Sequence, residues 1–314
     1  MTTLEQLTSA SLGARIVVIA GPTATGKTGA GSRLARALGG ELVGADSVQV
    51  YRGFDLGSAK PTAAELGGVP HHLIDVLDPE EEIDAQRFAD LADASIAGIV
   101  ARGRLPIVVG GTGLWVRALL RGLVELPPVD RALRARLEEE VRSLGSPALH
   151  ARLSEIDPLA AGKVHANDAL RIVRALEVNE QTGVPLGELR RQHALGADRY
   201  QALFCVVDLP RDELSARIEA RANQMLEAGW VEEVRELLAR HGPTTRALGA
   251  VGYREIVTHL ERGEPIEETR MHVVSATRRY ARHQRTWFRG EPGVNLRLTS
   301  EELTPERVER ELSP

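Results

Sequence analysis

The sequence has little cysteine, few aromatic residues and almost no lysine. Of its 314 residues one is a cysteine, Cys205, and 4% are aromatic. A single cysteine cannot form an internal disulfide, which excludes a disulfide scaffold, and its place in the apolar run 203–207 predicts a small buried side chain. With so few aromatics, the core must consist mainly of Ala, Leu, Val and Ile. The three lysines are Lys27, Lys60 and Lys163.

Long hydrophobic segments are also missing. No apolar run reaches the ~18 residues that a membrane-spanning helix needs. The first 14 residues lack the basic end and apolar stretch of a signal peptide. Because 43% of the residues are hydrophobic and 26% charged, the composition is that of a globular protein. We therefore expect a cytoplasmic protein with no membrane partner, and we take a monomer as its state.

Excess positive charge is missing overall, but not locally. The net charge of −5 alone argues against a nucleic-acid partner. Residues 269–290, however, contain no Asp or Glu, and they include Tyr280, Trp287, Phe288 and six arginines. Arginines interleaved with aromatic residues suit a phosphate backbone with unstacked bases, so this segment predicts RNA binding. The alternative is that these arginines pair with acidic residues elsewhere in the chain.

The N-terminal part alternates short apolar runs with helical patterns. Residues 15–20, 41–45 and 105–109 are predicted strands, and a helical pattern follows each. Uncharged strands alternating with helices indicate an α/β fold, a P-loop-type parallel sheet with helices on both faces.

The pattern changes near residue 130 and changes back near 196. The intervening segment is helical, charged and without a strand pattern, and residues 200–208 again resemble a strand. We predict a P-loop α/β catalytic core with a helical C-terminal part (1–129 and 196–314) and a helical insertion (130–195).

The strongest motif fits G-x-x-x-x-G-K-[ST] and lies between a predicted strand and a predicted helix. Its glycines let backbone N–H groups surround a phosphate at the positive end of the helix. Lys27 can then reach the outer phosphate and the Thr28 hydroxyl can ligate Mg²⁺. The simpler alternative is a glycine-rich turn. The predicted phosphate-binding residues are Gly21, Pro22, Thr23, Ala24, Thr25, Gly26, Lys27 and Thr28.

Two further candidates follow predicted strands. Asp46 comes just after the second strand, where open α/β sheets bind ligands, and could act as a general base or hold a metal. A turn former or helix N-cap is an equally good interpretation of this aspartate. Gly110–Gly113 would allow close backbone approach and direct the Thr112 hydroxyl into the same crevice, or it is a plain turn. We interpret His71 and His72 as structural.

Seen together, several segments resemble the tRNA isopentenyltransferase family. They are GPTATGKT (21–28), ADSVQVYRGFDLGSAKP (45–61), HHLIDVLDP (71–79), VVGGTGLWVRALLRGL (108–123), NDALRIVRALEV (167–178) and VGYRE (251–255). The resemblance runs from about residue 15 to 290. It implies transfer of a dimethylallyl group from dimethylallyl diphosphate to N6 of adenosine-37, beside the anticodon of tRNAs that read codons beginning with U.

The resemblance also implies site residues. Asp46 matches the general base, Thr112 a threonine beside the reacting carbon and Arg217 an arginine that holds the diphosphate. The matching tRNA contacts are Asp46, Ser47, Val48, Gln49, Thr112, Arg134, Leu170, Arg171, Ile172, Val173, Arg174, Gly249, Ala250, Val251, Gly252, Tyr253 and Arg254. Gly249 stands where some relatives carry a basic residue. The implied partners are the tRNA anticodon stem-loop and dimethylallyl diphosphate, with Mg²⁺ as cofactor.

Three other functions fit parts of the sequence. A P-loop small-molecule kinase shares the sheet and the phosphate loop, but it would not need the acid-free segment 269–290. A non-catalytic RNA-binding protein could use the loop as a nucleotide switch. A prenyltransferase acting on free adenine nucleotides would not need the tRNA-contact segments.

Overall fold

The computed structural model describes residues 12–193 and 198–313. Contacts between Cα atoms divide the chain into two compact units. The core unit combines residues 1–120 with 198–314, and the helical unit spans 121–197. The predicted insertion, 130–195, lies inside the helical unit, whose bounds are wider by nine residues at the start and two at the end.

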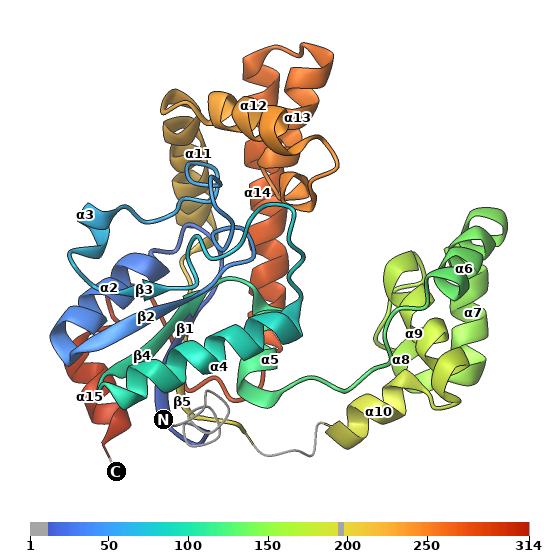
Figure 1. The fold of residues 1–314 in the computed structure, drawn as a ribbon, viewed down its shortest axis with the longest axis horizontal. Coiled ribbons are helices and arrows are strands. Elements are labelled where there is room, and N and C mark those ends of the chain that lie inside the picture. The colour runs from blue at the N-terminus through green and yellow to red at the C-terminus, as the bar shows by residue number, and fades with distance from the viewer. Residues whose placement is uncertain (1–11, 194–197, 314) are drawn as a thin grey trace. The chain divides into compact units, whose positions relative to one another are not determined.

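A six-stranded, fully parallel sheet with strand order β3-β2-β4-β1-β5-β6 forms the centre of the core unit (Figure 1). The strands are β1 (Arg15–Ala20), β2 (Gly40–Ala45), β3 (His71–His72), β4 (Leu105–Gly110), β5 (Gln201–Val207) and β6 (Leu296–Leu298). The predicted parallel α/β fold is confirmed. Strands β3 and β6 were not predicted, because two or three residues are too few to show a periodic pattern.

Helices cover both faces of this sheet. Alternate residues of β1, including Val17 and Ile19, share a hydrophobic cluster with α2 (Lys27–Leu38) and α15 (Pro305–Leu312). The intervening residues Ile16 and Val18 are equally buried, and α4 (Ala85–Ala101) lies across that other face in Figure 1. Burial on both faces explains why these strands consist almost entirely of apolar residues.

Cys205, in β5, is fully buried, as its apolar surroundings predicted. Burial raises the pKa of its thiol to about 12, which keeps the sulfur protonated and unreactive.

The remaining helices of the core unit precede or follow the strands. They are α3 (Ala63–Leu66), α5 (Gly113–Arg121), α11 (Arg211–Glu227), α12 (Trp230–His241), the 3₁₀ helix η1 (Arg246–Gly249), α13 (Tyr253–Arg262) and α14 (Ile266–Arg289). The long helix α14 packs along α11, beside the sheet (Figure 1). No helix among the described residues is long and apolar enough to cross a membrane.

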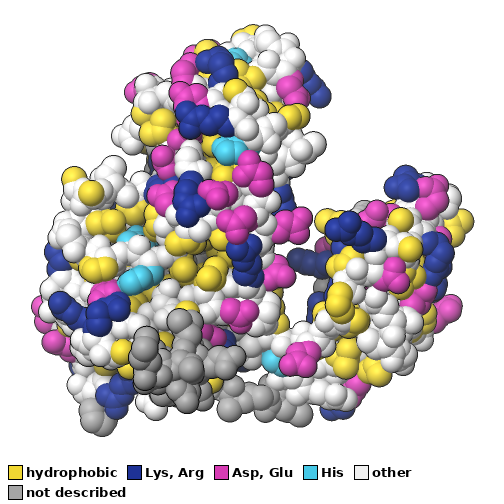
Figure 2. Space-filling view, viewed as in Figure 1, with side chains coloured by type: hydrophobic (Ala, Val, Ile, Leu, Met, Phe, Trp, Pro, Cys, Tyr) yellow, Lys and Arg dark blue, Asp and Glu magenta, His cyan; other side chains and the backbone are white. Residues whose placement is uncertain are grey.

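Helix α14 contains the acid-free segment, and its arginines are not all available to RNA. Arg278 pairs with Glu219 of α11 at 2.7 Å, and Arg285 pairs at 2.7 Å with Asp208, just after β5. The acids missing from the segment are thus supplied by neighbouring elements, and basic and acidic side chains are interspersed over the visible surface (Figure 2). Arg279, Arg282 and Arg289 are exposed. For Arg278 and Arg285 the structure shows the alternative, pairing with acidic residues elsewhere in the chain.

The helical unit has a hydrophobic core of its own. It contains α6 (Arg131–Leu144), α7 (Ser146–Ile156), α8 (Pro158–Ala161), α9 (Ala169–Thr182) and α10 (Leu186–His193). Leu137, Leu149, Leu153 and Leu176 belong to one buried cluster that joins these helices.

A buried carboxylate ties the start of the helical unit to α9. Glu177 is fully buried and accepts hydrogen bonds from the Asp130 amide at 3.0 Å and the Arg134 guanidinium at 2.7 Å. Arg174 forms a third contact with it, at 3.0 Å. Loss of a buried carboxylate with three partners leaves buried donors unsatisfied, which is costly.

We therefore expect Glu177→Gln to lower the free energy of local opening in α9 by about 3 kcal/mol. This value is at the lower end of the cost of breaking a buried ion pair, because both guanidinium groups keep some contact with water. Amide hydrogen exchange in α9 measures this quantity. The matched control is Glu139→Gln, whose carboxylate pairs with Arg142 on the surface, so its effect should stay below about 1 kcal/mol. Equal effects of the two substitutions would contradict the buried role of Glu177.

Candidate functional site

The glycine-rich loop between β1 and α2 has a backbone conformation suited to anions. Ala24 and Gly26 have positive φ angles of 64° and 84°, which turns successive N–H groups toward one side. The loop is closed internally, because the Pro22 carbonyl accepts hydrogen bonds from the Thr25 hydroxyl at 2.9 Å and from the Lys27 ammonium. Helix α2 begins at Lys27, so its positive end faces the loop.

Two cationic side chains stand close together behind this loop. Burial and the charge of Arg221 together lower the pKa of Lys27 to about 7, although Asp46 and Asp208 partly offset both effects. Burial also lowers the pKa of Arg221. Mutual repulsion between buried cations is relieved when an anion binds between them. The electrostatics therefore match a ligand with several negative charges, such as a diphosphate.

Asp46 lies at the carboxyl end of β2 and faces Thr112 at the end of β4. Its Oδ1 accepts hydrogen bonds from the amides of Val48, at 2.9 Å, and Gln49, at 3.3 Å. The Thr112 hydroxyl accepts a hydrogen bond from the Ser47 amide at 3.2 Å. The turn-forming interpretation of Asp46 is thus confirmed, and it does not compete with a catalytic one, because Oδ2 is not used by these bonds.

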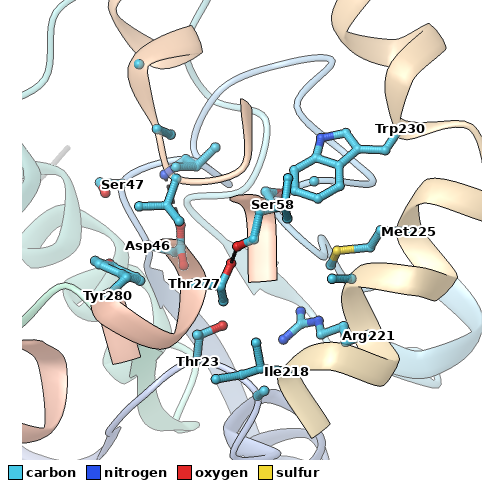
Figure 3. A pocket seen from close by; sticks show the side chains of 18 residues that line it. Thr23, Asp46, Ser47, Ser58, Ile218, Arg221, Met225, Trp230, Thr277 and Tyr280 are labelled. Atoms are coloured by element: carbon cyan, nitrogen blue, oxygen red, sulfur yellow. Dashed lines mark hydrogen bonds between the residues drawn. The ribbon is translucent and has the colours of Figure 1, made fainter. Parts of the chain in front are cut away.

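A cavity of about 260 Å³ opens between the phosphate loop, Asp46 and helices α11 and α14 (Figure 3). Thr23, Asp46, Arg221 and Tyr280 contribute polar groups to its wall. Its apolar wall includes Ile218, Ala222, Met225, Trp230 and Val273. A cavity with a carboxylate, a cation and an extended apolar wall can hold a ligand that is itself polar at one end and apolar at the other.

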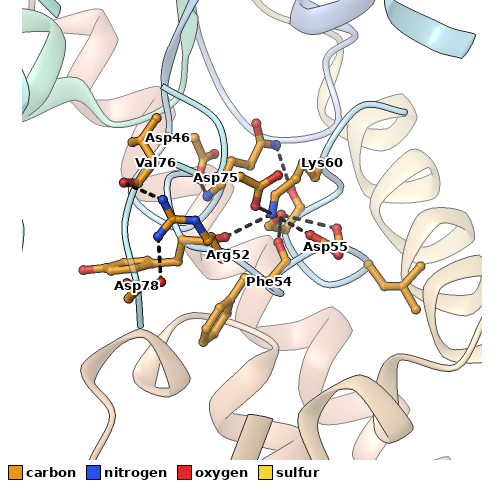
Figure 4. Close-up of polar contacts among 12 residues, drawn as sticks. Asp46, Arg52, Phe54, Asp55, Lys60, Asp75, Val76 and Asp78 are labelled. Carbon is orange, nitrogen blue, oxygen red and sulfur yellow. Dashed lines mark hydrogen bonds and ion pairs between the residues drawn. The ribbon is translucent and has the colours of Figure 1, made fainter. Parts of the chain in front are cut away.

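The loop that carries Asp46 is fixed by a buried lysine. The Lys60 ammonium contacts Asp55 and Asp75, each at 2.5 Å, and donates to the Tyr51 carbonyl at 3.0 Å (Figure 4). On the same loop, the Gln49 side chain donates to the Ser58 carbonyl at 2.9 Å. The predicted site residues 46–49 therefore have defined positions.

Glu233 of α12 holds the far end of this loop. Its carboxylate accepts hydrogen bonds from the amides of Asp55, Leu56 and Gly57 at 3.1, 2.6 and 3.2 Å. It also accepts a hydrogen bond from the Tyr253 hydroxyl at 2.7 Å. One carboxylate thus joins α12, α13 and the loop.

The structure distinguishes the two arginines that share one face of α11. Arg217 has a 40% exposed side chain, pairs with Glu213 at 2.9 Å and lies near Gly26 of the phosphate loop. Arg221, one turn further on, lines the cavity and stands near both Lys27 and Asp46. Arg217 thus lies beside the phosphate loop and stays the predicted diphosphate contact, and Arg221 is a second cation that sequence reasoning did not assign to the site.

Among the predicted contacts at 249–254, Gly249, Ala250 and Val251 line the cavity. Tyr253 does not, because its side chain is fully buried, with ring centroids 4.9 Å from Phe54 and 5.5 Å from Trp230. A Cβ on Gly252 would lie 2.2 Å from the Trp230 ring, so only glycine fits there. A side-chain contact of Tyr253 with RNA is incompatible with this packing, whereas Gly249 and Arg254 are exposed.

The predicted RNA contacts at 170–174 lie in the helical unit. They too include both buried and exposed side chains. Ile172 and Val173 belong to its hydrophobic core, so their side chains cannot contact RNA. Arg174, like Arg134, is directed to Glu177. Leu170, 81% exposed, and Arg171, with 65% of its side chain exposed, remain on the surface.

Sequence reasoning missed Trp230 and Tyr280 as residues that line the cavity. Each comes from a helix far along the chain from the phosphate loop, and no local motif indicates which face of those helices is directed inward. For Arg221 the signal was available, since it shares a helix face with Arg217.

The described residues contain no cluster of three or more His, Cys, Asp or Glu side chains that could hold a metal by themselves. Thr28, on the first turn of α2, offers one hydroxyl. This donor set suits Mg²⁺, which usually keeps several waters and binds through one or two protein ligands together with substrate phosphates.

An anion-binding loop, an adjacent carboxylate and a half-apolar cavity at the carboxyl ends of a parallel sheet suit an enzyme that binds a phosphorylated substrate. The family model described as IPP transferase matches residues 49–291. The chain therefore belongs to the IPP transferase family.

Individual relatives match nearly the whole chain. A tRNA dimethylallyltransferase of Anaeromyxobacter dehalogenans is 55% identical over 280 residues, 89% of this chain and 92% of the relative. A solved tRNA isopentenylpyrophosphate transferase of Bacillus halodurans is 40% identical with a TM-score of 0.66, over 90% of this chain and 89% of its own. A solved eukaryotic dimethylallyltransferase acting on tRNA is 26% identical with a TM-score of 0.73, over 91% of this chain and 74% of its own.

The lowered pKa of Lys27 predicts a pH dependence of diphosphate binding. Bound diphosphate raises this pKa above about 7, so binding takes up a proton when the pH is above about 7. The affinity for inorganic diphosphate should then fall as the pH rises from about 7, by up to tenfold per pH unit. Titration calorimetry measures the affinity for diphosphate of the protein and of Lys27→Met at the same pH values. The ratio of the two affinities is independent of the titration of diphosphate itself. An affinity ratio that stays constant up to about pH 9 would show that Lys27 does not titrate there.

Proposed function

We propose that this protein transfers a dimethylallyl group from dimethylallyl diphosphate to N6 of adenosine-37 in tRNAs that read codons beginning with U. The observation that carries the proposal is one cavity lined by a carboxylate, Asp46, and a cation, Arg221, with Lys27 of the phosphate loop close enough to interact with both. The names and the extent of the family matches support the same reaction.

The proposed reaction needs both halves of this arrangement. The exocyclic amine of adenine is a poor nucleophile, because its lone pair is delocalised into the ring, and a base must remove its proton. The allylic carbon becomes the electrophile as its bond to the diphosphate oxygen breaks, and that bond's electron pair leaves with the diphosphate. A new bond forms between N6 and the same carbon, and the proton passes to the base.

We assign the base to Asp46, whose Oδ2 is not used by its hydrogen bonds to the backbone. Lys27, Arg221 and the amides of residues 21–28 would stabilise charge on the leaving diphosphate. Thr112, bonded to the Ser47 amide, would fix the backbone next to Asp46. Arg217, which lies near Gly26 of the loop, would add a further contact to the diphosphate. Thr28 would ligate Mg²⁺, which when bound supplies further charge neutralisation of the diphosphate.

The acceptor proposed is the anticodon stem-loop. The target adenine must leave the stack of the loop to enter a cavity, as in other enzymes that modify bases. Exposed residues at which RNA contacts are proposed include Arg254 and Arg279 of the core unit and Leu170 and Arg171 of the helical unit. We keep the monomer and a cytoplasmic location as part of this proposal.

We expect Asp46→Ala to lower the transfer rate by about 10²–10⁴-fold, the usual contribution of a general base. Binding of tRNA should change little, because the reaction step and not the docking of the stem-loop requires the carboxylate. Single-turnover rates with labelled dimethylallyl diphosphate, beside filter binding of tRNA, measure the two separately. A near-normal rate at all pH values would refute the assignment.

Arg221→Met and Arg217→Met form a matched pair on one helix. Removing one donor to a leaving group costs about 10²–10³-fold in rate, and we expect this loss for Arg221, which lines the cavity. The loss for Arg217, which is partly exposed and paired with Glu213, should be smaller. Turnover and the Michaelis constant for dimethylallyl diphosphate decide between them, and a larger loss in Arg217→Met would reverse the assignment.

One assay separates the proposal from its rivals. The protein is incubated with labelled dimethylallyl diphosphate and either unfractionated tRNA, AMP or ATP, and in parallel with γ-labelled ATP. Label from the prenyl donor should appear in tRNA and not in AMP or ATP. Phosphoryl transfer from ATP would instead indicate a kinase, labelled AMP or ATP a free-nucleotide prenyltransferase, and binding of tRNA without any transfer an RNA-binding switch.

A further inference from the structure

Helix α14 sends one buried polar side chain between the two loops of the site. Gln284 is 6% exposed. Its amide oxygen accepts a hydrogen bond from the Thr23 amide of the phosphate loop at 2.9 Å. Its amide nitrogen donates to the Gly111 carbonyl, in the loop after β4, at 2.9 Å. A single side chain thus joins two loops that follow different strands.

The fit at this point is close. A Cβ on Gly111 would lie 2.3 Å from the Gln284 amide nitrogen and 3.3 Å from the Gly21 carbonyl oxygen. Glycine at 111 therefore lets the two loops approach, and Gln284 fills the remaining space with a donor and an acceptor in the required positions. Of the side chains that carry both groups, asparagine is one methylene too short to reach both loops.

We propose that Gln284 is a positioning residue that sets the distance between the bound diphosphate and the base. The phosphate loop would hold the leaving group, whereas Gly111 precedes Thr112, whose hydroxyl fixes the backbone beside Asp46. Gln284 joins these two halves without contacting either reacting group. This inference rests on the proposed transfer reaction.

The neighbouring turn of α14 extends the connection into the cavity. Tyr280 lines the cavity and lies one turn before Gln284 on the same helix. Burial and the charge of Asp46 raise the pKa of the Tyr280 hydroxyl, so it stays protonated and can donate. The segment predicted from sequence to bind RNA therefore also contributes the inward-facing residues Tyr280 and Gln284 to the site.

The test compares Gln284→Leu and Gln284→Glu with the same substitutions at Gln224, an exposed glutamine of α11. A misplacement of reacting groups by about 1 Å can cost about 10²-fold in rate. We expect a loss of that size in single-turnover transfer by Gln284→Leu, with unchanged Michaelis constant for tRNA and unchanged affinity for inorganic diphosphate. The Gln224 variants should behave as the unsubstituted protein.

Gln284→Glu adds a readout that a general loss of stability would not give. An ionised glutamate can accept from Thr23 but cannot donate to the Gly111 carbonyl, whereas a protonated one can do both. Burial raises the pKa of such a carboxyl. The rate of Gln284→Glu relative to the unsubstituted protein should therefore rise as the pH falls toward about 5, at a constant melting temperature.

The outcomes are separable. If the unsubstituted protein does not prenylate tRNA, the proposed function fails. If it does, and Gln284→Leu transfers at a normal rate, the positioning role is wrong. Loss of diphosphate affinity in proportion to rate would show that Gln284 only maintains the phosphate loop, which also overturns the proposal. Should Gln284→Leu fail to fold, the pH dependence of Gln284→Glu decides, and a constant rate ratio refutes the role.

Discussion

The site depends on holding Lys27 and Arg221 close together in a partly apolar environment. Burial lowers the pKa of both groups, and the charge of Arg221 further lowers that of Lys27, so the arrangement is unfavourable until an anion neutralises it. The rest of the core unit makes that arrangement possible. The sheet fixes the phosphate loop at the end of β1, α11 carries Arg221 to it, and Asp46 stands across the cavity from the arginine. For the proposed reaction, this preorganised positive charge stabilises the leaving diphosphate, and that gain outweighs its cost to the stability of the folded protein.

Helix α14 shows how two constraints share one helix. Its inner face packs Val273, Ala281 and Phe288 into the core and directs Gln284 to the loops of the site. Its outer face carries exposed arginines such as Arg282. An amphipathic helix with arginines outside and a few polar groups inside can pack against the core and also present positive charge to a nearby nucleic acid. The composition of the segment does not distinguish residues of the inner face from those of the outer face. For that reason the sequence alone suggested a uniformly basic segment.

The sequence was sufficient to predict what local patterns determine. The strand β1, the turn of the phosphate loop and helix α2 follow from contiguous residues, and so did the parallel sheet and the burial of Cys205. Long-range partners were out of reach. Nothing near Arg285 indicates Asp208, and nothing near Tyr253 indicates that Trp230 and Phe54 enclose its ring. A motif match identifies a segment, whereas burial decides which of its side chains can contact a ligand.

The segments that resemble the family contain two kinds of residue: some only maintain the cavity wall, and others would contact the substrate. Trp230 packs on Gly57 and Gly252, where no Cβ would fit, and so joins the loop after Asp46 to the segment 249–252. Glu233 strengthens this junction through the amides of Asp55 to Gly57. Both segments line the cavity, at Ser58 and at Gly249. Residues that only maintain the cavity wall are therefore as restricted in type as those that would contact the substrate, so residue type alone cannot separate the two roles.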